Sequence, residues 1–123
     1  MIDAALLSRG KLIRYPHADV EALEVALHRH PFSCRLVLTE SVFSMGGDIA
    51  PLKAIAKLCS KQNASFVVDD AHGFGVFGNQ GKGTLDLLQL KQSDVPVMMA
   101  TFGKALGCSG AFIAGSDSLI ELF

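Results

Sequence analysis

The chain has 123 residues, of which 50% are apolar and 19% are charged, and its formal net charge is −1. This composition is too apolar for a disordered chain, and the small net charge offers no electrostatic attraction to nucleic acid or to an anionic membrane. No apolar run approaches the roughly 20 residues that span a bilayer, and the first residues lack the segments of a signal peptide, so one soluble, cytoplasmic domain is expected.

The three cysteines, Cys34, Cys59 and Cys108, are widely spaced and lie among apolar residues. An odd number of distant cysteines favours neither a disulfide framework nor a zinc site. We therefore expect three reduced thiols in the protein core and no metal site.

The first third of the chain predicts a strand, a helix and a second strand. Residues 11–14 could form a short strand, which Pro16 would end. Asp19 is a suitable N-cap for a helix that runs to about His30. The apolar stripe of this helix consists of Val20, Leu23, Ala26 and Leu27. Residues 35–39 form a compact run of strand-forming residues.

A second helix is predicted after Pro51, because proline is tolerated in the first helical turn. Its apolar residues at helical spacing are Leu52, Ile55, Leu58 and Cys59. The clearest buried strand follows at residues 65–68 and ends in Asp69 and Asp70.

The last third of the chain begins with a glycine-rich stretch at residues 73–83, which does not read as regular structure. An apolar run at residues 95–102 precedes Gly103 and Lys104. A strand is then expected at residues 110–114, and a helix could begin within residues 118–123.

Strands that alternate with helices in this way predict an α/β fold, with a mostly parallel sheet flanked by helices. Ligands of such sheets bind beyond the carboxyl ends of the strands. Polar residues directly follow three of the apolar runs, at residues 39–44, 69–72 and 101–104. We expect these three polar segments to converge on one rim of the sheet.

Residues 73–78 match the pattern G-x-G-x-x-G, which would indicate a nucleotide-binding module. The dinucleotide motif requires this loop to open a helix directly after a strand, with an acidic residue about 20 positions further on. Here residues 69–72 intervene, and Asp86 and Asp94 are poorly placed. Glycines of turns and loops are the favoured interpretation.

The tetrapeptide Asp69-Asp70-Ala71-His72 places two carboxylates and an imidazole at the end of a predicted strand. Such a set could supply a charge partner and a hydrogen-bond donor on the rim. Taken alone, the tetrapeptide favours an ordinary helix-capping aspartate and a surface histidine. A metal site is less favoured, because cysteine ligands and a second histidine at ligand spacing are missing from the neighbouring sequence.

Lys104 lies among small and apolar residues, in the segment Ala100-Thr101-Phe102-Gly103-Lys104-Ala105-Leu106-Gly107. These neighbours predict partial desolvation, which would favour the neutral amine that reacts with a carbonyl group. The alternative is an ordinary solvated lysine in a loop.

Four segments together resemble the α-oxoamine synthase family, in order and in spacing. They are residues 39–45, 68–73, 78–83 and 101–107. Members of this family are fold-type-I enzymes that use pyridoxal 5′-phosphate (PLP) to join an amino acid to an acyl-CoA with loss of carbon dioxide. The resemblance implies that residues 1–123 are an incomplete, central part of the large PLP-binding domain of a homodimeric enzyme.

The resemblance also implies roles for five residues. Lys104 is similar to the lysine that holds the cofactor covalently and moves the α-proton of the substrate. Asp69 resembles the aspartate that faces the pyridine nitrogen, and His72 the histidine that contacts the phenolic oxygen. Thr101 matches a hydroxyl group that binds the phosphate, and Ser44 lies where another polar contact to the cofactor is expected.

Within the family, the Asp-Asp-Ala-His-Gly form and the Ser-Gly-Ala after Cys108 favour the branch of biotin biosynthesis, which joins L-alanine to pimeloyl-CoA. The branch of 2-amino-3-ketobutyrate CoA ligase is the alternative enzyme. Gly46 stands where many relatives carry aspartate.

The family's ring-stacking histidine, its earlier glycine-rich phosphate turn and its C-terminal domain have no counterpart within residues 1–123. Little activity is therefore expected of these residues alone. A catalytically inactive remnant or structural fragment is the competing interpretation.

Overall fold

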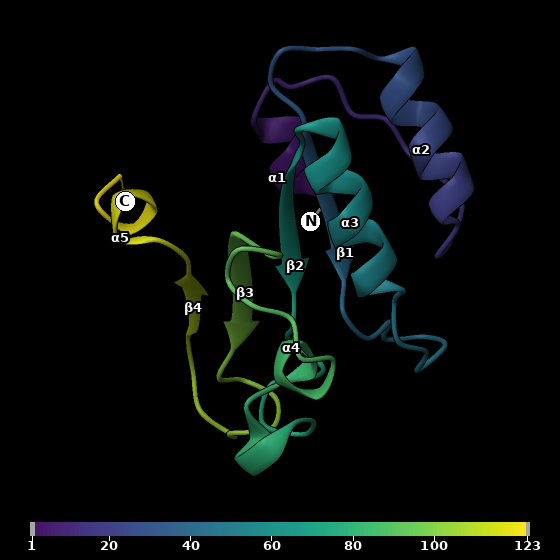
Figure 1. Cartoon of the computed structure of the whole chain (residues 1–123). Helices are drawn as coiled ribbons and strands as arrows, with labels where there is room; N and C mark the ends of the chain where they lie inside the picture. Colours follow the sequence, from purple (N-terminus) through teal and green to yellow (C-terminus); the bar gives the residue numbers. More distant parts are fainter. Residues whose placement is uncertain (1, 123) are drawn as a thin grey trace. The chain divides into compact units, whose positions relative to one another are not determined.

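The computed structural model describes residues 2–122 and divides the chain into two units, Met1–Ser33 and Cys34–Phe123. The first unit holds α1 (Ile2–Leu7) and α2 (Val20–Arg29) (Figure 1). The second unit holds the sheet and the remaining helices.

Helix α2 confirms the prediction made from its apolar stripe and its N-cap. Asp19 Oδ1 accepts a hydrogen bond from the Ala22 amide at 2.8 Å, and Leu23 and Leu27 are buried.

The predicted strand at residues 11–14 is wrong, since this segment is irregular and pairs with no strand of the described chain. A strand requires a neighbour for its backbone groups, and a four-residue pattern does not reveal whether one exists. Helix α1 was not predicted.

The sheet of the second unit has the order β1-β2-β3-β4. Its strands are β1 (Leu36–Glu40), β2 (Ser65–Asp69), β3 (Val97–Thr101) and β4 (Ala111–Ala114). The first three are parallel and β4 is antiparallel to β3. The predicted α/β fold with a mostly parallel sheet is confirmed.

One face of the sheet is buried beneath α3 (Leu52–Gln62), which packs on β2. Side chains alternate between the two faces of a strand, so Phe66 and Val68 of β2 lie in the core while Val67 and Asp69 are only half-buried. The core also includes Leu52, Ile55, Cys59 and Ala100. The side chains of Glu40 and Asp69, at the ends of β1 and β2, lie on the other face of the sheet and are only half-buried.

The connections that follow β2 and β3 lie at the same end of the sheet, where the arrows of β1, β2 and β3 point (Figure 1). The first contains the 3₁₀ turn η1 (Asn79–Gly81) and α4 (Thr84–Leu87). The G-x-G-x-x-G segment forms turns and opens no helix directly after β2, as the sequence predicted. The predicted C-terminal helix is α5 (Asp117–Ile120); Phe123 lies outside the described residues.

All three cysteines are free thiols, but only Cys59 is buried. Cys34 and Cys108 are exposed, so the prediction of three core thiols is wrong for two of them. Cys34 lies two residues before β1, and Cys108 lies in the loop between β3 and β4. Apolar neighbours in sequence indicate burial only within a regular element that packs on the core.

Candidate functional site

The pairing register of the parallel strands determines which residues lie together at the rim formed by their carboxyl ends. Glu40, the last residue of β1, pairs with Asp69, the last residue of β2, and Asp69 pairs with Met99 of β3. Directly paired residues of adjacent strands point to the same face of a sheet. Glu40 and Asp69 therefore lie side by side on the half-buried face.

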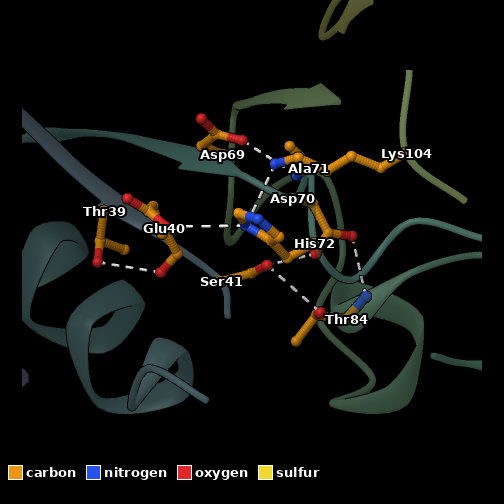
Figure 2. Close-up of polar contacts among 9 residues, drawn as sticks. All are labelled: Thr39, Glu40, Ser41, Asp69, Asp70, Ala71, His72, Thr84 and Lys104. Atoms are coloured by element: carbon orange, nitrogen blue, oxygen red, sulfur yellow. Dashed lines mark hydrogen bonds and ion pairs between the residues drawn. The ribbon is translucent and has the colours of Figure 1, made fainter. Parts of the chain in front are cut away.

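His72 and Lys104 lie close together at this rim, although they are far apart in sequence. The Lys104 Nζ atom is 3.4 Å from Nδ1 of His72. The same Nδ1 atom is 3.8 Å from Oε2 of Glu40. Figure 2 shows the three side chains converging from the ends of β1 and β2 and from the loop after β3. Glu40, His72 and Lys104 are called the rim triad below.

Asp69 fixes the turn that carries His72. Its Oδ1 atom accepts a hydrogen bond from the backbone N–H of Ala71 at 3.0 Å (Figure 2). A side-chain oxygen that bonds to a backbone N–H two residues ahead is a common device for stabilising a turn. The half-buried Asp69 thus holds the chain in position just before His72.

Asp70 faces the opposite way and is fully buried. Its Oδ1 atom accepts a hydrogen bond from the Ser41 hydroxyl at 2.5 Å, and its Oδ2 atom accepts one from the Thr84 amide at 2.9 Å. The Thr84 hydroxyl lies 3.4 Å from Ser41 Oγ. Asp70, Ser41 and Thr84 are called the buried triad, and they join the ends of β1 and β2 to α4 beneath the rim (Figure 2).

Two glycines allow the glycine-rich loop to close around the buried triad. A Cβ atom at Gly73 would overlap Thr84 Oγ1 and Asp70 Oδ1, and one at Gly83 would overlap Asp70 Oδ2. Gly83 also has a φ of +103°, which L-residues rarely adopt. The absence of a side chain at these two glycines therefore lets the loop pack against Asp70.

Lys104 is exposed, and so are the residues that follow it as far as Gly110. The predicted partial desolvation of Lys104 is therefore wrong for this chain. The prediction assumed that apolar neighbours would pack around the amine, whereas they turn with the loop into solvent. The loop itself is tied together by two backbone hydrogen bonds, from Cys108 N to Phe102 O at 2.9 Å and from Phe102 N to Gly110 O at 2.9 Å.

The Thr101 hydroxyl group serves the base of the same loop. It accepts a hydrogen bond from the Gly103 amide at 3.1 Å and donates one to the Gly110 carbonyl oxygen at 3.0 Å. A hydroxyl group has one proton to donate, so Thr101 can donate to a phosphate only if it releases Gly110.

Ser44 lies apart from these contacts, in the exposed turn that follows β1. No hydrogen bond within the described residues joins it to the rim triad. The structure thus brings Lys104, His72 and Asp69 to one rim and does not bring Ser44 or the Thr101 hydroxyl into contact with them.

Sequence reasoning assigned no role to Glu40 or to the buried triad. The sequence places Glu40 in the polar segment that follows the predicted strand at residues 35–39. The face of the sheet on which the Glu40 side chain lies depends on whether the strand includes Glu40. Asp70 was recognised only as the neighbour of Asp69, although two consecutive strand-end residues must face opposite sides. Nothing in the local sequence identified Thr84, because its partners lie 14 and 43 residues away.

Neither a metal site nor a membrane-crossing helix is found among residues 2–122. No group of three or more His, Cys, Asp or Glu side chains there could hold a metal ion. No helix of that region is both long enough and apolar enough to cross a bilayer.

Comparison with known proteins links the chain to one family. The family described as aminotransferase class I and II matches residues 1–123. The 8-amino-7-oxononanoate synthase of Hahella chejuensis is 52% identical over 121 residues, which cover 98% of this chain and 31% of that protein. The chain thus spans about a third of the length of this relative.

Two solved structures share the fold. The serine palmitoyltransferase of Sphingomonas wittichii superposes with a TM-score of 0.90 and 34% identity, over 98% of this chain and 30% of that chain. A high-resolution structure of SPT with PLP superposes with a TM-score of 0.83 and 35% identity, over 91% of this chain and 28% of the other.

Proposed function

The chain belongs to the aminotransferase class I and II family, and from this premise we propose that it forms the cofactor-binding part of a PLP-dependent 8-amino-7-oxononanoate synthase. The observation that carries the proposal is the 3.4 Å approach of Lys104 Nζ to His72 Nδ1 at a rim that Asp69 shares. The name of the Hahella relative and the PLP in the SPT structure support it.

The donor set of the rim fits the chemistry of PLP. A primary amine, Lys104, is the group that bonds to an aldehyde carbon, and an anion, Asp69, suits a protonated pyridine nitrogen. His72 provides a ring N–H for a phenolic oxygen. When bound, PLP supplies an electron sink that stabilises negative charge on the α-carbon of an amino acid.

Each residue then has a separate task. Lys104 would hold the cofactor and would carry a proton to or from the α-carbon of the substrate. Asp69 keeps the pyridine nitrogen protonated. His72 orients the ring through its phenolic oxygen, and Ser44 is assigned to a polar contact with the cofactor. Thr101 is assigned to a contact with the phosphate in addition to the loop hydrogen bonds that it makes without cofactor.

L-Alanine and pimeloyl-CoA are the substrates that we propose for the complete enzyme, with 8-amino-7-oxononanoate as the product. The alternative enzyme, 2-amino-3-ketobutyrate CoA ligase, would use glycine and acetyl-CoA. A longer protein that contains residues 1–123 should condense alanine and ignore glycine; the reverse preference would move the assignment to the ligase.

We further propose that residues 1–123 alone turn over little substrate, because catalysis needs substrate, cofactor and proton carrier in one near-attack geometry. The remaining groups would come from the segments of the family's chain outside residues 1–123, and the complete enzyme is proposed to act as a homodimer. The exposure of Lys104 favours the second candidate, a structural fragment that holds no cofactor.

Covalent labelling of Lys104 decides between the two candidates. The purified chain is incubated with PLP, reduced with borohydride and digested, and the labelled peptides are quantified. We expect label concentrated at Lys104, because His72 and Asp69 lie beside it and can orient the cofactor.

Lys82 provides the matched control, since it is also an exposed lysine in a glycine-rich segment. K104R should abolish the selective label, and K82R should leave it unchanged. Label spread evenly over surface lysines, or centred on Lys82, would contradict the proposed function and favour the structural fragment.

A further inference from the structure

Three phenylalanine rings connect the two segments that carry His72 and Lys104. Phe112 of β4 meets Phe74 edge to face, with 5.0 Å between the ring centroids and 70° between the ring planes. Phe112 also stacks on Phe102, with 5.3 Å between the centroids and 28° between the planes. Both centroid distances lie within the range of about 4.5–7 Å that favourable aromatic pairs adopt. Phe74, Phe102 and Phe112 are called the aromatic cluster below.

The two outer rings of the cluster each lie close in sequence to one residue of the rim contact. Phe74 follows His72 by two positions, in the turns after β2. Phe102 precedes Lys104 by two positions, and its amide donates a hydrogen bond to the Gly110 carbonyl oxygen at 2.9 Å. A Cβ atom at Gly110 would lie 3.3 Å from the Phe102 ring, so this ring packs against the base of the Lys104 loop. The central ring of the cluster therefore contacts the segment of His72 and the segment of Lys104 at the same time.

We propose that Phe112 is a positioning residue that keeps the amine of Lys104 within hydrogen-bonding distance of His72 Nδ1, because it holds Phe74 and Phe102 together. The inference rests on the proposed function for its purpose, since the amine of Lys104 is there the group that bonds to the cofactor. The contacts themselves belong to the chain without cofactor.

The register of the sheet places Phe112 on the face opposite to Asp69. Asp69 pairs with Met99 of β3, and the next residue, Ala100, points to the other face and pairs with Phe112. Phe112 thus lies across the sheet from the rim carboxylates. Its influence on Lys104 is therefore attributed to its two ring partners.

The Lys104 loop needs such a support, because residues 103–110 are exposed and burial of the loop does not fix it. Lys104 Nζ nonetheless lies 3.4 Å from Nδ1 of His72, and an ammonium group can only donate, so Nδ1 accepts. One hydrogen bond between solvent-accessible groups contributes little order by itself. The half-buried rings of the cluster supply apolar contacts that restrict the position of the loop.

A second contact joins the same two segments. A Cβ atom added at Gly75 would lie 2.7 Å from Cβ of Ala105, the residue that follows Lys104. The glycine-rich loop therefore packs directly against the Lys104 loop. The aromatic cluster holds the two segments at the separation that this packing requires.

The test measures the contact between Lys104 and His72 without cofactor, by ¹⁵N NMR of the chain labelled at its histidine rings. H72N identifies the His72 signals. K104M removes the donor and nearly keeps the length of the side chain, so the Nδ1 resonance of His72 should move at a pH where the rings are neutral. In F112L, which stays apolar but lacks the ring, the shift that K104M causes should fall to about half or less, because such a double comparison measures the coupling of two sites.

Further variants separate positioning from a loss of stability. F112Y keeps the ring and should retain most of the parent shift. I55V removes a methyl group from the buried core of α3 and should lower stability without reducing the shift. F32L makes the same exchange at a ring that stacks on His30 and should also leave the shift of His72 unchanged.

Four results would overturn the proposal: a full shift in F112L, an equal reduction in F112Y, an equal reduction in I55V, or no response of His72 to K104M in the parent. F74L removes only the contact with the His72 segment and should also reduce the shift. This variant decides the question if F112L does not fold.

Failure of this inference is distinguishable from failure of the proposed function. Selective PLP labelling of Lys104, together with a full NMR shift in F112L, would remove the role of Phe112 and leave the function. A reduced shift in F112L without selective labelling of the parent would remove the cofactor role and leave Phe112 as the residue that positions Lys104 against His72.

Discussion

The Ser41 hydroxyl donates a hydrogen bond to the Asp70 carboxylate across the ends of β1 and β2, with 2.5 Å between Oγ and Oδ1. Both side chains are fully buried, and the Thr84 amide satisfies the second carboxylate oxygen. The two adjacent aspartates therefore have different roles. Asp69 lies at the rim, whereas buried Asp70 connects the ends of β1 and β2 to α4 through hydrogen bonds.

D70N should destabilise the chain strongly. The amide retains one acceptor oxygen and brings an NH₂ group against either the Ser41 hydroxyl or the Thr84 N–H, so a buried group is left unpaired. We expect a loss of about 2–3 kcal/mol in the free energy of unfolding, measured by urea denaturation. D117N, at an exposed aspartate of α5, should change it by less than about 0.5 kcal/mol. Equal effects of the two variants would contradict the anchoring role.

G83A should be far more costly than G47A, although both glycines have positive φ. Gly47 has a φ of +71° and no atom within 4 Å of an added Cβ, so alanine there meets only backbone strain of roughly 1–2 kcal/mol. At Gly83 the added methyl group would also overlap the Asp70 carboxylate. We expect G83A to lose at least ~2 kcal/mol more than G47A in urea denaturation, because strain and overlap add. Similar losses would show that the loop yields around Asp70.

Most of the sheet could be predicted from the sequence because burial imposes strong local patterns. The strands at residues 65–68 and 110–114 are rich in apolar residues, and the helices after Asp19 and Pro51 combine a stripe with an N-terminal signal. The family resemblance, read from four segments, is confirmed by the match over the whole chain. Short elements such as α1 and α4 carry too few residues for a pattern, and their formation depends on tertiary contacts.

The candidate site was predicted less completely than the fold. Convergence of His72 and Lys104 on one rim followed from parallel topology alone. The exposure of Lys104 and the position of Ser44 depend on loop conformation, which local sequence does not determine. The contacts of Thr101 with Gly103 and Gly110 likewise arise only when the loop closes on itself.

Cys59 should react with alkylating reagents much more slowly than Cys34 and Cys108. Burial raises the pKa of the Cys59 thiol from 9.0 to about 11, because desolvation disfavours the thiolate. The two other thiols are exposed. Iodoacetamide at pH 8, followed by mass spectrometry of the peptides, should modify Cys34 and Cys108 first and Cys59 only after addition of urea. Equal rates in the folded chain would contradict the burial of Cys59.

The same pKa shift predicts how stability depends on pH. The folded-state pKa is raised above the unfolded value, so the stabilisation is fully present below pH 9 and is lost as the pH rises from 9 to about 11. The loss is at most roughly 2–3 kcal/mol, from about 1.4 kcal/mol per pKa unit. In C59A this loss of free energy of unfolding between pH 9 and 11 should be smaller than in the parent. If the free energy of unfolding depended on pH identically in the parent and in C59A, Cys59 would be excluded as the source of the loss.

T101V should loosen the loop that carries Lys104, whereas T101S should not. Valine has nearly the shape of threonine but can neither accept from the Gly103 amide nor donate to the Gly110 carbonyl, and serine can do both. Each hydrogen bond contributes about 1 kcal/mol, so hydrogen exchange of the Gly103 amide should accelerate roughly fivefold or more in T101V. S109A, at an exposed position of the same loop, is the control.

The label at Lys104 then distinguishes the two tasks considered for Thr101. If its hydroxyl group mainly holds the loop, T101V should lower PLP labelling of Lys104 in proportion to the faster exchange of Gly103, and T101S should restore both. If the hydroxyl group mainly binds the phosphate, T101V should lower labelling while exchange of Gly103 stays at the parent rate. Because both hydrogen bonds of Thr101 are made within the loop, we expect the first result. Unchanged exchange in T101V would contradict it.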